Sequence, residues 1–173
     1  EFEIDEVLAG SDVVVNPDGA IVEIDGYQML SLAWANPTPW KSPRELPEEE
    51  LAARIERLAR ELDPSLPVIF NLHCPPYDST LDSAPQLRED LSVVMVGGHP
   101  NMVPVGSRAV REAIERYQPV VSLHGHIHES RGAVRIGRTL CINPGSAYGE
   151  GVLHGALVRL ENDRVASYQL VSG

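Results

Sequence analysis

Three histidines stand at alternate positions after a short apolar segment in the second half of the chain. Residues 120–129 read Val-Val-Ser-Leu-His-Gly-His-Ile-His-Glu, which places His124, His126 and His128 at every second position. In an extended backbone, residues two positions apart lie on the same face of a strand. We therefore expect His126 and His128 to direct two imidazoles at one point. Because neutral imidazole is the commonest protein ligand for metals, the spacing predicts part of a metal site.

A fourth histidine follows another apolar segment. Residues 68–72, Val-Ile-Phe-Asn-Leu, have the composition of a buried parallel strand, and His73 comes directly after them. Ligands of α/β proteins bind at the carboxyl ends of parallel strands, so His73 is expected near the other histidines. Taken alone, His73 would more often be a hydrogen-bonded structural residue. For His124 the sequence leaves two roles open: it orients a metal ligand, or it is a plain strand residue.

The elements that must position these histidines alternate between helix and strand. Apolar positions with a 3.6-residue period predict helices over residues 47–62 and 107–117. Each helix is followed by a predicted strand, over residues 68–72 and 120–128, and a short helix is also expected over residues 85–91. This alternation is typical of βαβ units, so the sequence predicts an α/β fold with parallel strands that carry histidines to one sheet edge.

The rest of the chain is predicted to be antiparallel. Residues 11–15, 20–24 and 27–33 are separated by Asn-Pro-Asp-Gly and Asp-Gly turns, and we expect them to form a three-stranded meander. Further hairpins are expected over residues 132–143 and 153–170. No internal repeat interrupts the pattern, and 173 residues suit one domain that spans residues 1–173.

Two further residues are candidates for contact with a substrate. Trp40 lies in a loop over residues 36–44 that holds three prolines, and long loops between firm elements are often functional. Trp40 lines a pocket in one interpretation and packs over the sheet in the other, which the sequence favours. Arg108 follows Val-Gly-Ser at a helix start, where backbone N–H groups and a positive charge can bind an anion.

Composition limits the partners and the compartment. A net charge of −11 argues against a nucleic-acid or acidic-membrane partner, although a bound cation can still attract a phosphorylated substrate. No apolar run approaches the roughly 18 residues of a membrane span. Cys74 and Cys141 are too few for a disulfide framework, so we expect buried thiols in a reducing cytoplasm. Whether copies of the chain associate into a homo-oligomer is left open.

Taken together, three motifs resemble those of a known superfamily. They are His73 within Asn-Leu-His-Cys-Pro-Pro, Gly-His-Ile-His at residues 125–128 and Asn-Pro-Gly-Ser at residues 143–146. In this order they resemble the C-terminal half of calcineurin-like metallophosphoesterases. The sequences around Trp40 and Arg108 resemble the Icc-related predicted phosphoesterases of that superfamily. The resemblance covers nearly the whole chain and implies a four-layer α/β/β/α sandwich.

The resemblance also implies a reaction and a metal centre. The enzyme would hydrolyse a phosphomonoester or phosphodiester of a small substrate at two divalent metal ions, which could be Mn, Fe, Zn or Co. By motif match, His73 and His126 would bind one ion and His128 the other. Metal coordination lowers the pKa of a bound water that attacks phosphorus, and it neutralises charge on the phosphoryl oxygens.

The sequence departs from the superfamily in its first part. Asp-x-His, Gly-Asp-x-x-Asp and Gly-Asn-His or Gly-Asn-Asp do not occur, although they supply the bridging carboxylate and most remaining ligands. The chain is therefore expected to be the C-terminal portion of a longer enzyme and inactive alone. The alternative is a non-catalytic, truncated or degenerate domain that binds at most one metal ion, since three histidines and a water can hold one zinc ion.

Overall fold

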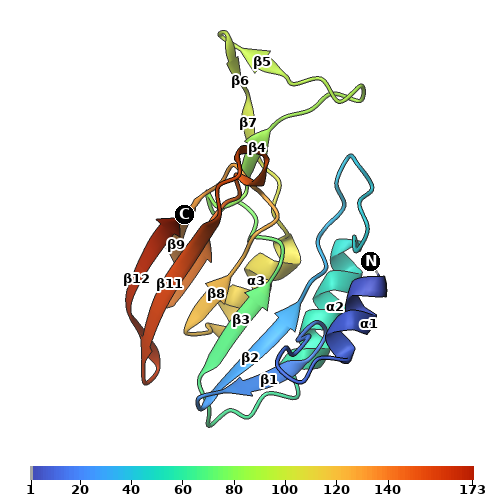
Figure 1. The fold of residues 1–173 in the computed structure, drawn as a ribbon. Helices are drawn as coiled ribbons and strands as arrows, with labels where there is room; N and C mark the ends of the chain where they lie inside the picture. Colours follow the sequence, from blue (N-terminus) through green and yellow to red (C-terminus); the bar gives the residue numbers. More distant parts are fainter. Residues whose placement is uncertain (1) are drawn as a thin grey trace.

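A six-stranded mixed sheet forms the centre of the protein, for which a computed structural model describes the backbone of residues 2–173 and the side chains from Glu6 onward (Figure 1). Its strand order is β1-β2-β3-β8-β10-β9. The four inner strands run parallel to one another and are β2 (Tyr27–Leu32), β3 (Val68–Leu72), β8 (Val121–Leu123) and β10 (Thr139–Asn143). The two edge strands are antiparallel to their neighbours and are β1 (Ile21–Ile24) and β9 (Gly132–Ile136).

Two helices cover one face of this sheet, as the sequence predicts. They are α2 (Glu48–Ala59) and α3 (Arg108–Tyr117), each slightly shorter than expected. The side chain of Ser107 accepts a hydrogen bond from the Val110 N–H at 3.2 Å, which makes Ser107 the N-cap of α3. A third helix, α1 (Phe2–Ala9), precedes the sheet. None of the helices in residues 2–173 has the length and apolar composition of a membrane span.

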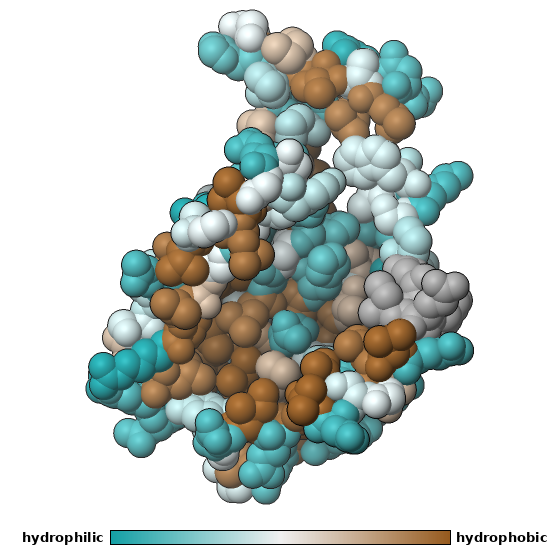
Figure 2. All heavy atoms as spheres, in the orientation of Figure 1, coloured by the Kyte–Doolittle hydropathy of each residue, from teal (hydrophilic) through white to brown (hydrophobic). Residues whose placement is uncertain are grey.

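The two sheet faces carry separate apolar clusters. On the helix face, Leu30 and Phe70 are fully buried against residues of both helices, such as Leu51 and Ile114. The opposite face is covered in part by the hairpin of β11 (His154–Glu161) and β12 (Arg164–Ser172). The apolar side chains of this second cluster come from the sheet and the hairpin: Met29, Ile69, Val121, Leu123, Leu140, Ile142, Ala156, Val158, Leu160, Val165 and Leu170. Figure 2 shows a hollow beside the hairpin whose floor is largely hydrophobic.

An arm projects from the body beyond the carboxyl ends of the parallel strands (Figure 1). We define the arm as residues 83–104, and its strands are β4 (Ser83–Pro85), β5 (Met95–Val96), β6 (His99–Pro100) and β7 (Met102–Pro104). β4 pairs with β7 in the stalk, and β5 pairs with β6 at the tip. A short 3-10 helix (Tyr148–Glu150) lies between β10 and β11.

Two predicted elements are absent from the described structure. Residues 11–15 form no strand, and Val13 is 91% exposed, so nothing covers an apolar face that could hold them in a sheet. The three-stranded meander is therefore a two-stranded hairpin, and β2 pairs in parallel with β3 instead. The helix expected over residues 85–91 is also absent. Leu87 forms a β-bridge with Val93, and Leu91 has a φ of 65°, which a right-handed helix excludes.

The coarse fold prediction is confirmed. The chain is a mixed α/β structure with parallel inner strands, and both predicted C-terminal hairpins are present. Cys74 and Cys141 are buried free thiols, as expected. Burial raises the pKa of each thiol to about 12, so both stay protonated at neutral pH.

Candidate functional site

The loop after β8 bends sharply and does not continue the strand. β8 ends at Leu123, and His126 has a φ of 63°, in the left-handed region. The Ile127 N–H donates to the Gly125 carbonyl at 2.7 Å, which closes a tight turn around His126. The expectation that His126 and His128 share one face of an extended strand is therefore wrong, because a turn replaces the strand at these positions.

The turn brings His126 to His73. The centroids of the two imidazole rings are 5.1 Å apart, and the rings meet edge to face at 68°. Backbone hydrogen bonds fix both loops: the His73 N–H donates to the Leu32 carbonyl at 3.0 Å, and the Gly125 N–H donates to the His73 carbonyl at 2.9 Å. His128 packs its ring against Tyr148, with centroids 5.5 Å apart. The loops after β3 and β8 thus meet as the sequence predicts, although by a different backbone path.

The Asn-Pro-Gly-Ser motif forms hydrogen bonds to the loop that carries His126 and His128, which we call the histidine loop. The fully buried Asn143 donates through Nδ2 to the Ile127 carbonyl at 2.9 Å and to the Leu81 carbonyl at 3.1 Å. The Ser146 N–H donates to the His128 carbonyl at 3.1 Å. Gly145 has a φ of 70°, and a Cβ there would lie 2.9 Å from the His128 carbonyl oxygen. The Asn-Pro-Gly-Ser motif therefore holds the backbone of the histidine loop in place.

The surroundings keep His73 and His126 neutral. Burial of its imidazole, with a smaller effect from the positive charges that His126 and His128 would carry, lowers the pKa of His73 to about 4. Burial also lowers the pKa of His126, and the nearby Glu45 carboxylate opposes this shift. His73 nevertheless remains accessible to solvent. At neutral pH each ring keeps a free lone pair, the form that binds a metal cation.

His124 has a structural contact instead of a place in the cluster. Its buried Nδ1 lies 2.9 Å from the Leu72 carbonyl and 3.0 Å from the Cys74 carbonyl. Since carbonyls only accept hydrogen bonds, Nδ1 must carry the proton. Burial lowers the pKa of His124 to about 4, so the ring is neutral. His124 thus ties the end of β8 to the backbone on either side of His73.

Arg108 lies at a helix start whose anion-binding groups are already used. The Glu48 carboxylate accepts hydrogen bonds from the Ser107 hydroxyl at 2.7 Å, the Arg108 N–H at 3.2 Å and the Ala109 N–H at 2.9 Å. The guanidinium of Arg108 stacks on the Tyr77 ring, 4.0 Å from its centroid. The protein's own carboxylate thus occupies the N-terminus of α3. The role of Arg108 toward a substrate stays a prediction.

Trp40 is 64% exposed, so the expectation that it packs over the sheet is wrong. Its loop is held by Glu45, whose carboxylate accepts from the Thr38 N–H at 3.0 Å and the Ser42 N–H at 2.7 Å. These hydrogen bonds close the loop on itself, so the indole is left in solvent. A role for Trp40 in substrate contact stays a prediction.

A cavity of about 500 Å³ opens beside His73, over the carboxyl ends of β2, β3 and β8. This size suits a small ligand. Its polar wall includes Ser31 and Asn71, joined by a hydrogen bond of 3.2 Å, and the ion pair of Arg44 with Asp18 at 2.7 Å. Sequence reasoning did not select these residues, although Asn71 is the single polar residue of β3 and was a usable signal.

The donor set at this site is incomplete for two metal ions. His73 and His126 offer neutral imidazoles, which suit ions such as Zn²⁺ or Fe²⁺. Among the side chains that the structure describes, no three His, Cys, Asp or Glu residues come together as a group able to hold a metal. The residues therefore fit part of one metal site and do not form a two-metal centre by themselves.

Comparison with curated proteins gives a relative without an assigned activity. No family model matches the chain. Uncharacterized protein MJ1162 of Methanocaldococcus jannaschii is 28% identical over 132 residues, which are 75% of this chain and 53% of that protein. The chain thus spans about half the length of the curated relative that it matches.

Solved structures support the fold alone. One crystal structure aligns over 98% of this chain and 54% of its own with a TM-score of 0.58 and 16% identity. Thermus thermophilus sulfate thiohydrolase SoxB, in complex with glycerol, is also 16% identical and aligns over 88% of this chain and 24% of its own. Its TM-score of 0.41 is too low to carry an argument.

These findings correct the family assignment. The predicted membership in the calcineurin-like metallophosphoesterases, and in their Icc-related group, is wrong as a statement of family. No family model matches, and the neighbours are a hypothetical protein and a distant enzyme at a TM-score of 0.41. Short motifs that follow strand ends can match in order without a family relationship that whole-chain comparison supports.

Proposed function

We propose that the protein to which this chain belongs hydrolyses a phosphomonoester or phosphodiester with divalent metal ions, and that His73, His126 and His128 supply imidazole ligands. The observation that carries this proposal is the edge-to-face pair of His73 and His126, whose ring centroids are 5.1 Å apart. The pair lies at the carboxyl ends of parallel strands, and both pKa values are lowered. Neutral imidazoles in that place have the right form and position for metal ligands.

Each part of the site has a role in the proposed reaction. A bound divalent ion supplies a water of lowered pKa and positive charge for the phosphoryl oxygens. His73 and His126 hold that ion, and Asn143 fixes the loop between His126 and His128. The cavity beside His73 receives the organic part of a small phosphorylated substrate. Trp40 and Arg108 remain candidate substrate contacts.

The remaining ligands, carboxylates above all, would come from segments outside this chain, which spans about half of its curated relative. We further propose that the complete protein has the four layers α/β/β/α, with a second sheet that extends the β11–β12 hairpin. The support is the hydrophobic hollow beside that hairpin, since an apolar floor of this kind is normally covered (Figure 2). Free thiols and a charge of −11 agree with a cytoplasmic protein without nucleic-acid or membrane partners.

Hydrolysis of bis(p-nitrophenyl) phosphate and p-nitrophenyl phosphate by the complete protein tests this function. We expect turnover with Mn²⁺ or Zn²⁺, loss of turnover with a chelator, and loss of turnover in His126→Ala. His99→Ala is the matched control, because His99 lies on the arm, and it should keep full activity. Full activity of His126→Ala would contradict the proposed function.

A second candidate is a non-catalytic domain that binds at most one metal ion. It is favoured by the absence, among the described side chains, of any group of three ligands that could hold a metal. Metal analysis of this chain after dialysis distinguishes this non-catalytic candidate from a chain that holds a complete two-metal centre. Two tightly bound ions per chain would rule out the non-catalytic candidate.

A further inference from the structure

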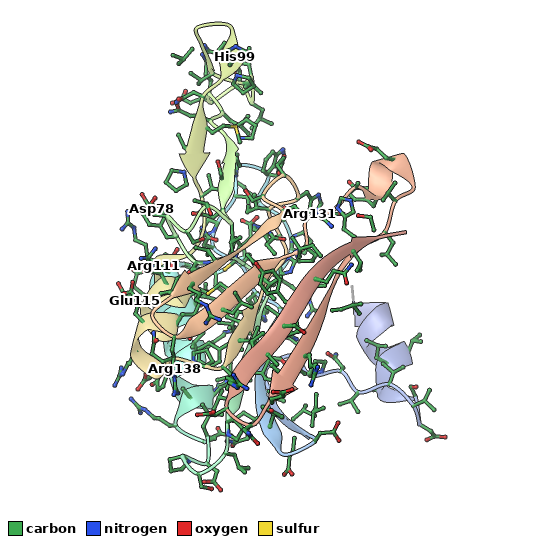
Figure 3. All side chains as sticks on the ribbon, turned by 90° about the vertical axis from the view of Figure 1, so that its left-hand side faces the viewer. Asp78, His99, Arg111, Glu115, Arg131 and Arg138 are labelled. Atoms are coloured by element: carbon green, nitrogen blue, oxygen red, sulfur yellow. The ribbon has the colours of Figure 1, made fainter. Side chains whose placement is uncertain are left out.

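The arm is fixed firmly at its root. The Asp82 carboxylate, which directly precedes the arm, accepts hydrogen bonds from the backbone N–H groups of Asp78, Ser79 and Gly106 at 2.9–3.0 Å. The Ser130 hydroxyl donates to the Ser83 carbonyl at 2.7 Å. Figure 3 shows the arm extending away from the sheet, with His99 at its far end. The arm therefore has a defined direction although its tip lies apart from the body.

The arm carries several exposed apolar side chains. Between residues 88 and 100 every residue except Val94 is exposed. Hydrophobic residues gather on the arm in Figure 2, and its exposed large apolar side chains are Leu91, Val93, Met95, Val96 and Met102. A two-stranded ribbon is at best marginally stable in water unless something packs against it. No described residue outside the arm covers these side chains, so they are free to contact a partner.

Prolines restrict how that partner can bind. Pro85, Pro100 and Pro104 lie in three of the four arm strands. Proline has no N–H to donate, so each of these strands offers an interrupted edge for strand addition. Contact is therefore expected through the apolar side chains and not through the backbone edges.

The distribution of charge selects the partner. Residues 91–107 contain no Asp, Glu, Lys or Arg, although the chain carries a net charge of −11. In a contact with twofold symmetry, each charge near the axis meets its own copy, so a self-complementary surface there must be uncharged. The bodies of two copies repel each other over roughly 8 Å at physiological salt. The part of the arm from residue 91 to residue 104 is uncharged and holds the contact away from the acidic bodies, so it satisfies both conditions.

We propose that the arm is a self-association surface, through which two copies of this protein pack their arms together about a twofold axis. The proposal is independent of the proposed function. It does have a consequence for the site, since Asn143 contacts both the Leu81 carbonyl near the arm's root and the Ile127 carbonyl of the histidine loop. Packing of the arm would therefore steady the loop that carries His126.

Sedimentation equilibrium of the complete protein tests the proposal. We expect a dimer at micromolar concentration and a dissociation constant raised roughly 100-fold by Val96→Asp, because both copies lose a buried apolar contact. Leu157→Asp is the matched control, since Val96 and Leu157 are each 62% exposed and Leu157 lies on β11, outside the arm. A monomeric wild-type protein, an undisturbed Val96→Asp dimer, or equal loss in the control would overturn the proposal.

A cysteine variant covers the case in which Val96→Asp merely unfolds the arm. Val96→Cys keeps an apolar side chain, and the chain's own cysteines are buried. Near a twofold axis, mild oxidation should join two copies through Cys at this position, with Leu157→Cys as the control that stays unlinked. A covalent dimer supports arm-to-arm packing. Absence of the link in a protein that is dimeric in solution would overturn it.

Discussion

The two faces of the central sheet differ in how completely they are covered. On one face, α2 and α3 bury Leu30 and Phe70 completely, and the core is closed. On the other face, a single hairpin covers part of the surface and leaves a hydrophobic hollow. His73 follows Ile69 and Asn71 at alternate positions, which places it toward the open face. The comparison teaches that stability comes mainly from one face and that the candidate site opens toward the other.

The largest expected effect comes from shortening one side chain on each face of the sheet. Phe70→Ala should lower the free energy of unfolding by about 3–5 kcal/mol, since it leaves a cavity in the closed core. Met29→Ala, on the partly covered face, should cost about 1 kcal/mol. Urea denaturation of this chain measures both. Equal losses would show that the second face is packed as well as the first.

Acid should weaken the protein through its neutral histidines. Burial lowers the pKa of His124 to about 4 from an ordinary 6.5, so below pH 6.5 the unfolded chain binds a proton that the folded chain refuses. Stability in the absence of metal should therefore be highest above pH 6.5 and fall toward pH 4, by roughly 3 kcal/mol at most for this residue. His124→Gln cannot titrate and should show a shallower fall. An unchanged pH profile in that variant would contradict this account of His124.

Removing the Asn143 side chain should make the histidine loop at the candidate site less rigid. Asn143→Ala leaves the Ile127 and Leu81 carbonyls without their side-chain donor, at a cost of about 1–3 kcal/mol in unfolding free energy. Metal affinity of the complete protein should fall about 10–100-fold, as for other residues that orient ligands. Asn101→Ala, which removes only a contact to Gln86 on the arm, is the control. Unchanged metal affinity in Asn143→Ala would show that the Asn-Pro-Gly-Ser motif does not position the histidine ligands.

The smallest expected effect concerns the start of α3 on the closed face. Glu48→Gln removes the negative charge from the helix N-terminus while Ser107 still caps it, so the loss should be about 0.5–1 kcal/mol. Glu49→Gln removes an exposed glutamate of α2 and should change stability less. Thermal unfolding compares the two variants. A larger loss in Glu49→Gln would show that the Glu48 carboxylate does not stabilise the start of α3.

Periodicity predicted the parts of the fold in which local pattern and burial agree. The helices over residues 47–62 and 107–117 were found because their apolar positions repeat every 3.6 residues. β3 was found because all of its residues except Asn71 are apolar. Residues 13–15 are three valines, yet no described segment covers them, and a local pattern cannot register that absence. The arm was missed for a related reason, because its strands are too short to show a period.

At the site, the sequence predicted which loops meet but not how. That His73 and His126 come together follows from parallel strands whose carboxyl ends share one edge. The sequence does not predict the turn at His126, because a positive φ is unusual for a residue other than glycine. Glu48 precedes Arg108 by about sixty positions and still fills the helix start there, a contact that only tertiary structure reveals.

Metal binding by the paired histidines is the central claim, and calorimetric titration of Zn²⁺ into the complete protein tests it most directly. The wild-type protein and His99→Ala should bind the ion equally well. His126→Ala should lose more than about 100-fold in affinity, because it removes a ligand itself. If His126→Ala binds Zn²⁺ as tightly as the wild-type protein does, the imidazole pair is not a metal site and the account fails.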